Sequence, residues 1–390
     1  MDSLVSDLIS VVGAGHVLTD PQVLAGYTTD WTRRYGGAAR CAVRPGSTAE
    51  VAEAIRVCAR HGRPVIPQGG NTGLVGGSVP GGGPAGAAAP VVLSTRRLRQ
   101  LGPVDTLAAQ VTAGAGVTIA ELRGHAAAAG FEYGVNLASR DSATVGGTIA
   151  TNAGGVHTIR YGGTRAQLLG VEAVLADGSV ISRLGGIPSD NTGYDLAQLL
   201  AGSEGTLAVI TAARLRLWPA EPPVATVLAG VDGAGAAAAL YAEIRSRIPS
   251  VRAAEYFEAP GLALVRKHTG LPAPLGSDYP AYLLVEAGGP PGNAERMAEI
   301  PLLADAAVAV DGPGRAALWA YRERHTESIS AAGIPHKLDL AVPLARLAGL
   351  RAGLDEVVKA ASAPADPLTI VFGHIGAGNL HVNILGPDPG

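Results

Sequence analysis

The sequence contains little cysteine, with only Cys41 and Cys58 in 390 residues. The two are not in C-x-x-C spacing, and two thiols cannot form a metal cluster alone. Cys58 falls on the apolar face of an expected helix, so we interpret it as a core residue. A metal cluster built from cysteine is therefore excluded.

The sequence also lacks an uncharged apolar span long enough for a membrane helix. Its N-terminus carries Asp2 and Asp7 where a secretion signal would have basic residues. The net charge is only −3, and no run of like charge suggests nucleic acid or an anionic membrane surface. We therefore expect a cytoplasmic protein with no transmembrane segment and no nucleic-acid partner.

Two common nucleotide-binding patterns are missing from the main glycine-rich loops, which lie at 64–77 (PVIPQGGNTGLVGG) and 145–155 (VGGTIATNAGG). Neither loop reads G-x-G-x-x-G before a long helix, and neither ends in Gly-Lys-Ser/Thr. These absences disfavour nicotinamide and nucleoside triphosphate ligands.

Both loops alternate glycine with polar residues such as Asn71, Thr72, Thr151 and Asn152. Glycine allows positive φ and lets the backbone approach a pyrophosphate closely. The chain has 54 glycines, however, so composition and spacing alone do not decide between a phosphate cradle and plain turns.

The length exceeds the size at which single cores usually stop growing, so we expect two or more cores. A proline cluster at 218–223 (WPAEPP) predicts a domain boundary, because proline removes backbone donors. We expect an N-terminal helical segment at 1–35, a cofactor domain at 36–219 and a second domain at 220–390.

The first half has the pattern of an α+β domain. Ser47 to Glu50 is typical of a capping box that begins a helix over 47–61, and Asp177-Gly178 is typical of a hairpin turn. We expect a further helix at 118–130 and strands at 90–94, 109–113, 171–176 and 207–211.

The second half alternates strand-like and helical segments. This pattern predicts an antiparallel sheet with helices on one side. The expected strands are 224–230, 281–288 and 368–375, and the expected helices are 233–247, 293–303, 313–332 and 344–361.

Four segments, in this order, resemble a known family: PQGGNTGLVGG; ATVGGTIATNAGG with RYGGTRAQLLGVEAVLADGSV; TGYDLAQLLAGSEGTLAVITAARLRL; and FGHIGAGNLHVNI. The chain resembles FAD-linked oxidoreductases of the vanillyl-alcohol oxidase and p-cresol methylhydroxylase type, in the branch of D-lactate, glycolate and D-2-hydroxyglutarate dehydrogenases. The resemblance implies an α+β fold. In it, a two-subdomain FAD-binding domain of the PCMH type precedes a cap domain, with an antiparallel sheet and helices, that holds the substrate.

The resemblance implies FAD as cofactor. It also implies that the first loop binds the pyrophosphate, the second the other phosphate and the ribityl chain, and a third segment the ring or the adenosine. Because the first loop has Asn71 and no histidine, we expect noncovalent FAD. The implied cofactor residues are Pro67, Gln68, Gly69, Gly70, Asn71, Thr72, Gly73, Leu74, Ser142, Gly146, Gly147, Thr151, Asn152, Gly155, Glu204, Gly205 and Ile210.

His374 and His381 lie seven residues apart in GHIGAGNLHVN. Two neutral imidazoles could bind a divalent metal such as zinc, and the alternative is two polar side chains on a strand edge. The resemblance implies that both are metal ligands and that Asn383 contacts the substrate.

A second cluster supplies Arg322, Thr326 and Lys337, the last being one of only three lysines in the chain. Arginine can bind a carboxylate with two parallel hydrogen bonds, and lysine adds a compact charge. The alternative is a solvated helix face, which we favour for Arg324. For the other three the resemblance implies binding of a dicarboxylate or another small 2-hydroxy acid.

The sequence departs from the family pattern at Ala377, where the family has an acidic residue. It also ends at Gly390, without the Glu-His-Gly segment that supplies a third metal ligand and the catalytic base in relatives. The base is therefore unknown, and a water, Asp388 or a partner chain would have to complete the metal site.

The implied reaction is oxidation of a 2-hydroxy acid to a 2-oxo acid, with hydride transfer to flavin N5 and reoxidation by an unknown electron acceptor. Two alternatives stay open: a metal-independent flavin oxidase of the same fold, and a noncatalytic FAD-binding subunit of a larger dehydrogenase. A partner subunit or a homodimer is open as well.

Overall fold

The computed structural model describes residues 2–81, 88–187, 190–290, 292–300, 306–362 and 367–386. The chain divides into two compact units. Met1–Gly154 and Tyr161–Ala220 form the first unit, whereas Gly155–Arg160 and Glu221–Gly390 form the second. The division after Ala220 falls inside the proline cluster, and the short segment 155–160 belongs with the second unit.

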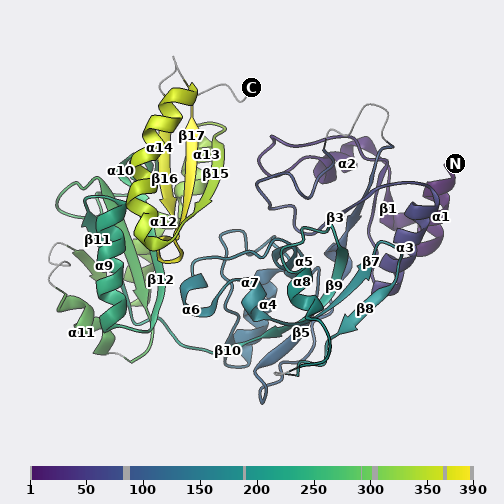
Figure 1. The fold of residues 1–390 in the computed structure, drawn as a ribbon, viewed down its shortest axis with the longest axis horizontal. Coiled ribbons are helices and arrows are strands. Elements are labelled where there is room, and N and C mark those ends of the chain that lie inside the picture. The colour runs from purple at the N-terminus through teal and green to yellow at the C-terminus, as the bar shows by residue number, and fades with distance from the viewer. Residues whose placement is uncertain are drawn as a thin grey trace. The chain divides into compact units, whose positions relative to one another are not determined.

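The strands of the first unit form two larger sheets and one short pair (Figure 1). Their bounds are β1 Val17–Leu18, β2 Cys41–Val43, β3 Val65–Gln68, β4 Val91–Ser94, β5 Gln110–Gly114, β6 Phe131–Glu132, β7 Leu168–Leu175, β8 Val180–Arg183, β9 Ala208–Arg216 and β10 Trp218–Pro219. One sheet has the order β1-β2-β4-β3, in which β4 runs parallel to β2 and β3. The other is antiparallel, in the order β5-β9-β7-β8, and β10 pairs with β6.

The sequence prediction for these strands is largely confirmed. The expected strands at 90–94, 109–113, 171–176 and 207–211 are β4, β5, β7 and β9. The Asp177-Gly178 turn joins β7 to β8, with Gly178 at a φ of 82°. The segment 1–35 is not purely helical, because it also supplies β1, which pairs with β2.

The helices of the first unit pack on these sheets. They are α1 Ser3–Val12, α2 Pro21–Thr28, α3 Thr48–Arg60, α4 Ile119–Ala128, α5 Val145–Ala150, α7 Thr164–Gln167 and α8 Leu196–Leu200, with α6 Thr158–Tyr161 at the division and short 3₁₀ turns at Ala14–His16 and Thr95–Arg97. Helix α3 buries Val51, Ile55 and Cys58 in the core, which confirms the interpretation of Cys58.

The start of α3 differs in one detail from the predicted capping box. The Ser47 hydroxyl accepts a hydrogen bond from the Glu50 backbone N–H at 3.2 Å, as expected. The Glu50 carboxylate, however, accepts from the N–H of Gly46 at 2.7 Å and not from that of Ser47. The reciprocal bond is therefore displaced by one residue toward the N-terminus.

The second unit is built on one seven-stranded antiparallel sheet (Figure 1). Its strands are β11 Ala225–Val231, β12 Val251–Glu258, β13 Ala281–Ala287, β14 Ala306–Ala309, β15 His336–Ala341, β16 Leu368–Gly373 and β17 Asn379–Leu385. Their order is β14-β11-β13-β12-β16-β17-β15, so β15, β16 and β17 lie together at one end of the sheet.

Helices cover both faces of this sheet, so the expectation of helices on one side is wrong. Val227 and Leu283 pack in a core with α9 (Ala234–Arg247) and α14 (Leu347–Ser362). Their neighbours Leu228 and Leu284 point the other way, into a core with α10 Ala259–Thr269, α12 Gly312–Glu323 and α13 His325–Ala332. The near-continuous apolar runs of β11 and β13 are typical of strands buried on both faces.

The expected helix over 313–332 is two helices, because Arg324 adopts a ψ of −3° between α12 and α13. Arg322 and Thr326 therefore lie on different helices.

The expected helix at 293–303 is α11 Gly292–Ala298, and its predicted residues beyond 300 lie outside the described part. Two 3₁₀ turns, Leu344–Arg346 and Ile375–Ala377, complete the unit. None of the helices in the described ranges combines the length and apolar character needed to cross a membrane.

Candidate functional site

The two predicted cofactor loops are in direct backbone contact within the first unit. A Cβ added to Gly70 would lie 2.0 Å from the carbonyl oxygen of Ser142. One added to Gly69 would lie 2.4 Å from Oγ1 of Thr144. Any larger residue at either position would push the loops apart, so these glycines are required for the contact.

The third predicted segment joins the same place. The N–H of Glu204 donates to the carbonyl of Ala150 at 2.8 Å. A Cβ on Gly205 would lie 3.0 Å from the ring of Pro67, and one on Gly77 would lie 3.1 Å from the Glu204 carboxylate. The fold therefore brings together segments near residues 70, 145 and 204.

Positive φ values concentrate in these segments. Among the described residues, the non-glycine positions with positive φ include Asn71 (54°), Asn152 (48°) and Glu204 (51°), and only Arg33 and Ala109 share this conformation. An L-residue pays a conformational cost there, and such positions cluster at binding sites. Three of the five described non-glycine residues with positive φ therefore lie in the segments that carry the predicted cofactor residues.

Two predicted side chains hold the first loop in shape. The Gln68 amide donates to the carbonyls of Tyr27 and Ser78 at 2.9 and 2.8 Å. The Asn71 amide donates to the carbonyl of Thr29 at 2.9 Å and accepts from the Ser78 hydroxyl at 2.8 Å. These amides are engaged within the loop, which leaves the backbone to face a ligand.

The backbone of the first loop supplies unused donors. No N–H group from Gly70 to Val75 donates a hydrogen bond to another group of the described chain. Thr72, Gly73 and Leu74 belong to this run, and Leu74 is exposed. Successive free N–H groups in a glycine-rich turn form a concave anion site. This donor set fits the pyrophosphate of FAD.

The other predicted cofactor residues fall into two groups. Gly146, Gly147, Thr151 and Asn152 lie in or just after α5: a Cβ on Gly146 would clash with Ala115, and the Thr151 hydroxyl donates to the Gly147 carbonyl. Two others lie elsewhere. Ile210 is in the core of the first unit, 5% exposed, and Gly155 belongs to the second unit.

The second unit holds the two predicted metal ligands. His374 follows β16 and His381 lies on β17, and their rings meet edge to face with centroids 5.1 Å apart. The rings are partly buried, with 21% and 28% of the side chains exposed. The histidines seven positions apart in the sequence are therefore neighbours in the fold.

Each histidine is hydrogen-bonded to a carboxylate through Nδ1. The His374 Nδ1 lies 2.7 Å from Oε1 of Glu255, and the His381 Nδ1 lies 3.1 Å from Oδ1 of Asp339. When Nδ1–H donates to a carboxylate, Nε2 carries the lone pair that a metal requires. The sequence analysis missed both carboxylates. Only Asp339 had a local signal, since it lies two residues from Lys337 on one strand.

The histidine pair fits part of a metal site. Two imidazoles bound tetrahedrally through Nε2 to zinc have ring centroids roughly 5 Å apart, close to the observed separation. In the part of the chain that the structure describes, no group of three or more His, Cys, Asp and Glu residues is arranged to hold a metal ion. Asp388, considered above as a further ligand, lies outside the described residues. The residues present thus supply two nitrogen ligands.

The strands β15 and β17 place the predicted substrate residues beside these histidines. Lys337 lies opposite Asn383 and Asp339 lies opposite His381 in the antiparallel register. Residues two apart on a strand share a face, so all four project from the same side of the sheet. Asn383 is buried, and burial lowers the pKa of Lys337.

Arg322 reaches the same face from helix α12. Its Nε donates to Oε2 of Glu255 at 2.8 Å, and its guanidinium lies 4.7 Å above the ring of Phe372. The two terminal nitrogens of Arg322 donate to no group of the described chain. Thr326 lies partly exposed on α13. By contrast, Arg324 forms an exposed ion pair with Glu327 at 2.9 Å, as expected for a solvated helix face.

The charges of this cluster influence one another. Burial raises the pKa of Glu255, but the contacts of its carboxylate with His374 and Arg322 outweigh this effect and hold that pKa below its usual value. Burial lowers the pKa of His381, and the hydrogen bond to Asp339 opposes this only in part. The Glu255 carboxyl is therefore ionised, and His381 is neutral at neutral pH.

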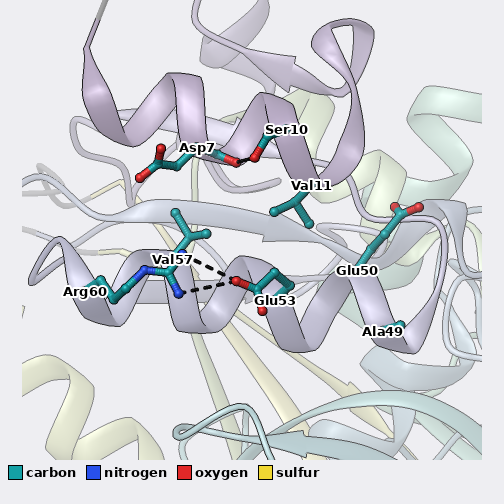
Figure 2. A pocket seen from close by; sticks show the side chains of 8 residues that line it. All are labelled: Asp7, Ser10, Val11, Ala49, Glu50, Glu53, Val57 and Arg60. Carbon is teal, nitrogen blue, oxygen red and sulfur yellow. Dashed lines mark hydrogen bonds and ion pairs between the residues drawn. The ribbon is translucent and has the colours of Figure 1, made fainter.

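A separate hollow of about 500 Å³ lies in the first unit between α1 and α3 (Figure 2). It contains none of the predicted site residues, and its Glu53 forms hydrogen bonds with Arg60 at 3.3 and 3.4 Å. It is lined by Asp7, Ser10, Val11, Ala49, Glu50, Glu53, Val57 and Arg60. We assign this open, charged surface no part in the site.

Comparison with known protein families finds two matches that together cover most of the chain. Residues 39–183 match the FAD binding domain family. Residues 221–388 match the C-terminal domain of the FAD linked oxidases.

Curated relatives match nearly the whole chain. The mitochondrial D-2-hydroxyglutarate dehydrogenase of Bos taurus is 37% identical over 380 residues, which cover 95% of this chain and 68% of the relative. The D-2-hydroxyglutarate dehydrogenase of Xanthomonas citri pv. viticola is 33% identical over 395 residues, which cover 99% of this chain and 81% of the relative.

Solved structures share the fold. An alkyldihydroxyacetonephosphate synthase has a TM-score of 0.77 at 17% identity. The alignment covers 99% of this chain and 76% of the synthase chain. The p-cresol methylhydroxylase structure with bound substrate has a TM-score of 0.71 at 15% identity. The alignment covers 99% of this chain and 83% of the methylhydroxylase chain.

Proposed function

Since the chain belongs to the FAD-linked 2-hydroxy acid dehydrogenases, we propose that its substrate is a D-2-hydroxy dicarboxylate of the 2-hydroxyglutarate type. Family membership confirms the predicted class of reaction, the FAD-dependent oxidation of a 2-hydroxy acid to a 2-oxo acid. It also confirms the predicted fold, a PCMH-type FAD-binding domain followed by a cap.

The observation that carries the choice of a dicarboxylate is the pair of cations beside the histidines. The outer nitrogens of Arg322 have no partner in the described chain, and Lys337 projects from the same face of the sheet. A monocarboxylate such as lactate needs one cation, whereas a dicarboxylate needs two. The D-2-hydroxyglutarate dehydrogenases named among the relatives support the same choice.

Each predicted site residue of the second unit has a proposed role. Arg322 and Lys337 each bind one carboxylate, while Thr326 and the Asn383 amide donate hydrogen bonds to the substrate. His374 and His381 would hold a divalent metal such as zinc through Nε2, and the chemistry such an ion supplies is a lower pKa for the substrate hydroxyl. The residue that takes the hydroxyl proton stays unassigned.

In the first unit, the free N–H groups from Gly70 to Val75 would bind the FAD pyrophosphate without a covalent link. FAD, when bound, supplies an acceptor for the hydride of the substrate. Glu204, Gly205 and the loop at 142–152 line the same place and complete the cradle. Contacts of Ile210 and Gly155 with the cofactor stay predictions.

The experiment is anaerobic mixing of the FAD-loaded protein with D-2-hydroxyglutarate, D-lactate, glycolate and the L enantiomer of 2-hydroxyglutarate. The measured quantity is bleaching of the visible flavin band, with and without added zinc or manganese. Preferential bleaching by D-2-hydroxyglutarate supports the proposal. Faster bleaching by D-lactate or glycolate would contradict the dicarboxylate assignment.

The same experiment separates the two alternatives. Full turnover without metal and rapid peroxide formation in air would favour a metal-independent flavin oxidase. Yellow protein that no acid bleaches until a second protein is added would favour a noncatalytic subunit. The cytoplasmic location, the electron acceptor and the assembly state stay predictions or open.

A further inference from the structure

Glu255 is a fully buried carboxylate in the middle of strand β12, with none of its side chain exposed. It belongs to none of the motifs that identify the family in the sequence. Its two oxygens have different partners: Oε1 lies 2.7 Å from the His374 Nδ1, and Oε2 accepts from the Arg322 Nε at 2.8 Å. One side chain therefore connects a proposed metal ligand with a proposed carboxylate-binding residue.

Stability does not explain this arrangement. Burying a carboxylate removes its hydration, and replacing a buried ion pair with apolar residues is often neutral or stabilising. The partners of Glu255 also come from distant positions, 119 and 67 residues away in the sequence. A charge kept at this place therefore fits a role in the geometry of the site.

Both hydrogen bonds fix a direction. Donation from Nδ1–H of His374 leaves the Nε2 lone pair on the opposite edge of the ring, where a ligand can meet it. Binding of the Arg322 Nε fixes the plane of the guanidinium and leaves its two terminal nitrogens without a partner in the described chain, ready for a carboxylate. The ring of Phe372 beneath the guanidinium restricts it further.

We propose that Glu255 is the positioning residue of this site, whose single carboxylate aligns the metal-binding His374 with the carboxylate-binding Arg322. This inference rests on the proposed function. One buried side chain then sets the distance between the metal-binding imidazole of His374 and the carboxylate-binding guanidinium of Arg322.

Glu258 offers a matched control on the same strand. It is also buried and paired, with Oε1 accepting from the Arg351 Nε at 2.6 Å and from the Tyr256 hydroxyl at 2.9 Å. Being three residues from Glu255, it projects from the opposite face of the sheet. Glu258→Gln therefore removes a buried ion pair of the unit without touching His374 or Arg322.

The first measurement needs neither cofactor nor activity. In protein carrying ¹⁵N-labelled histidine, the His374 signals are assigned by their loss in His374→Gln, and long-range ¹H–¹⁵N spectra report which ring nitrogen carries the proton. We expect Nδ1–H in the unsubstituted protein and in Glu258→Gln. A proton on Nε2 alone in the unsubstituted protein would overturn the proposal, whatever the substrate proves to be.

The second measurement compares Glu255→Gln and Glu258→Gln in the FAD-loaded protein. Glutamine has one oxygen where glutamate has two, so its NH2 group would face one of the two donors, and we expect Glu255→Gln to raise KM for D-2-hydroxyglutarate by about tenfold or more. Zinc affinity, from titration against a competing chromophoric chelator, should fall about 10- to 100-fold. Glu258→Gln should keep both values within about twofold, even if its melting temperature falls.

The outcomes are distinct. Equal losses in the two variants would mean that Glu255 acts only through the stability of the unit and would overturn the positioning role. Unchanged KM and unchanged zinc affinity in Glu255→Gln would do the same. If the unsubstituted protein binds no zinc or oxidises no 2-hydroxy acid, the proposed function fails, and the His374 tautomer still decides the role of Glu255.

Discussion

The contact between the two cofactor loops gives the sharpest prediction, because a single methyl group should disrupt it. In Gly70→Ala the new Cβ would lie 2.0 Å from the Ser142 carbonyl oxygen and 3.2 Å from the Cα of Ala143. The three nearest atoms all belong to the backbone, so no side-chain rotation can relieve the clash. Restoring a 3.4 Å contact from 2.0 Å requires a displacement of about 1.4 Å.

Overpacking of this kind typically costs about 1–3 kcal/mol. If the loops separate in the free protein, FAD binding must bring them back together, and affinity should fall about 5- to 140-fold. If they cannot separate, the free protein should lose the same free energy, or about 2–4 °C of melting temperature for each kcal/mol. We therefore predict the sum of the loss in FAD binding free energy and the loss in unfolding free energy of the FAD-free protein.

The assay is a fluorescence titration of the FAD-free protein with FAD, together with thermal unfolding with and without FAD. Gly73→Ala is the matched control, because a Cβ there meets no atom within 4 Å and φ is not positive. It should leave the melting temperature of the FAD-free protein unchanged or raise it slightly. Gly70→Ala with full FAD affinity and unchanged melting temperatures would refute the inferred contact between the loops.

Three further predictions concern single side chains. His325 is fully buried, and burial followed by the charge of Arg322 lowers its pKa from 6.5 to about 3. Between these two pKa values only the unfolded chain binds the proton, so the free energy of unfolding should fall by up to about 1.4 kcal/mol for each unit of falling pH. His325→Phe should flatten that slope when urea unfolding is measured over a series of pH values. Lys337→Met should raise KM for D-2-hydroxyglutarate about tenfold or more and leave that for D-lactate nearly unchanged, because only the dicarboxylate needs the second cation; equal losses for both acids would contradict this role. Thr118→Ala removes the hydroxyl that accepts from the Glu121 N–H at the start of α4 and should lower the unfolding free energy by about 1 kcal/mol in urea; an unchanged value would mean that this cap adds nothing.

The local features of the fold were predictable because their causes are local. Ser47 caps α3, and the Asp177-Gly178 turn closes its hairpin, through hydrogen bonds and φ values that depend on a few neighbouring residues. The glycine-rich loops could likewise be recognised, since glycine interleaved with polar residues is visible in the sequence.

Where the sequence analysis failed, the missing information was not local. Helices cover both faces of the second sheet because the apolar runs of β11 and β13 bury side chains in both directions, a pattern that we interpreted as ordinary strands. The break at Arg324 contains no glycine or proline to mark it. The Glu50 carboxylate accepts from the N–H of Gly46 and not from that of Ser47, a choice that the Ser47–Glu50 spacing does not reveal.

The sequence by itself therefore determined the chemical parts of this protein: two glycine-rich loops with interleaved polar residues, two histidines, and the cations Arg322 and Lys337. The tertiary structure decided how they meet. It brought Gly70 against Ser142, and it placed the Glu255 carboxylate between His374 and Arg322. Residue types and short periods are carried by neighbouring positions, whereas contacts across 67 or 119 residues depend on strand order and register, which no local pattern encodes.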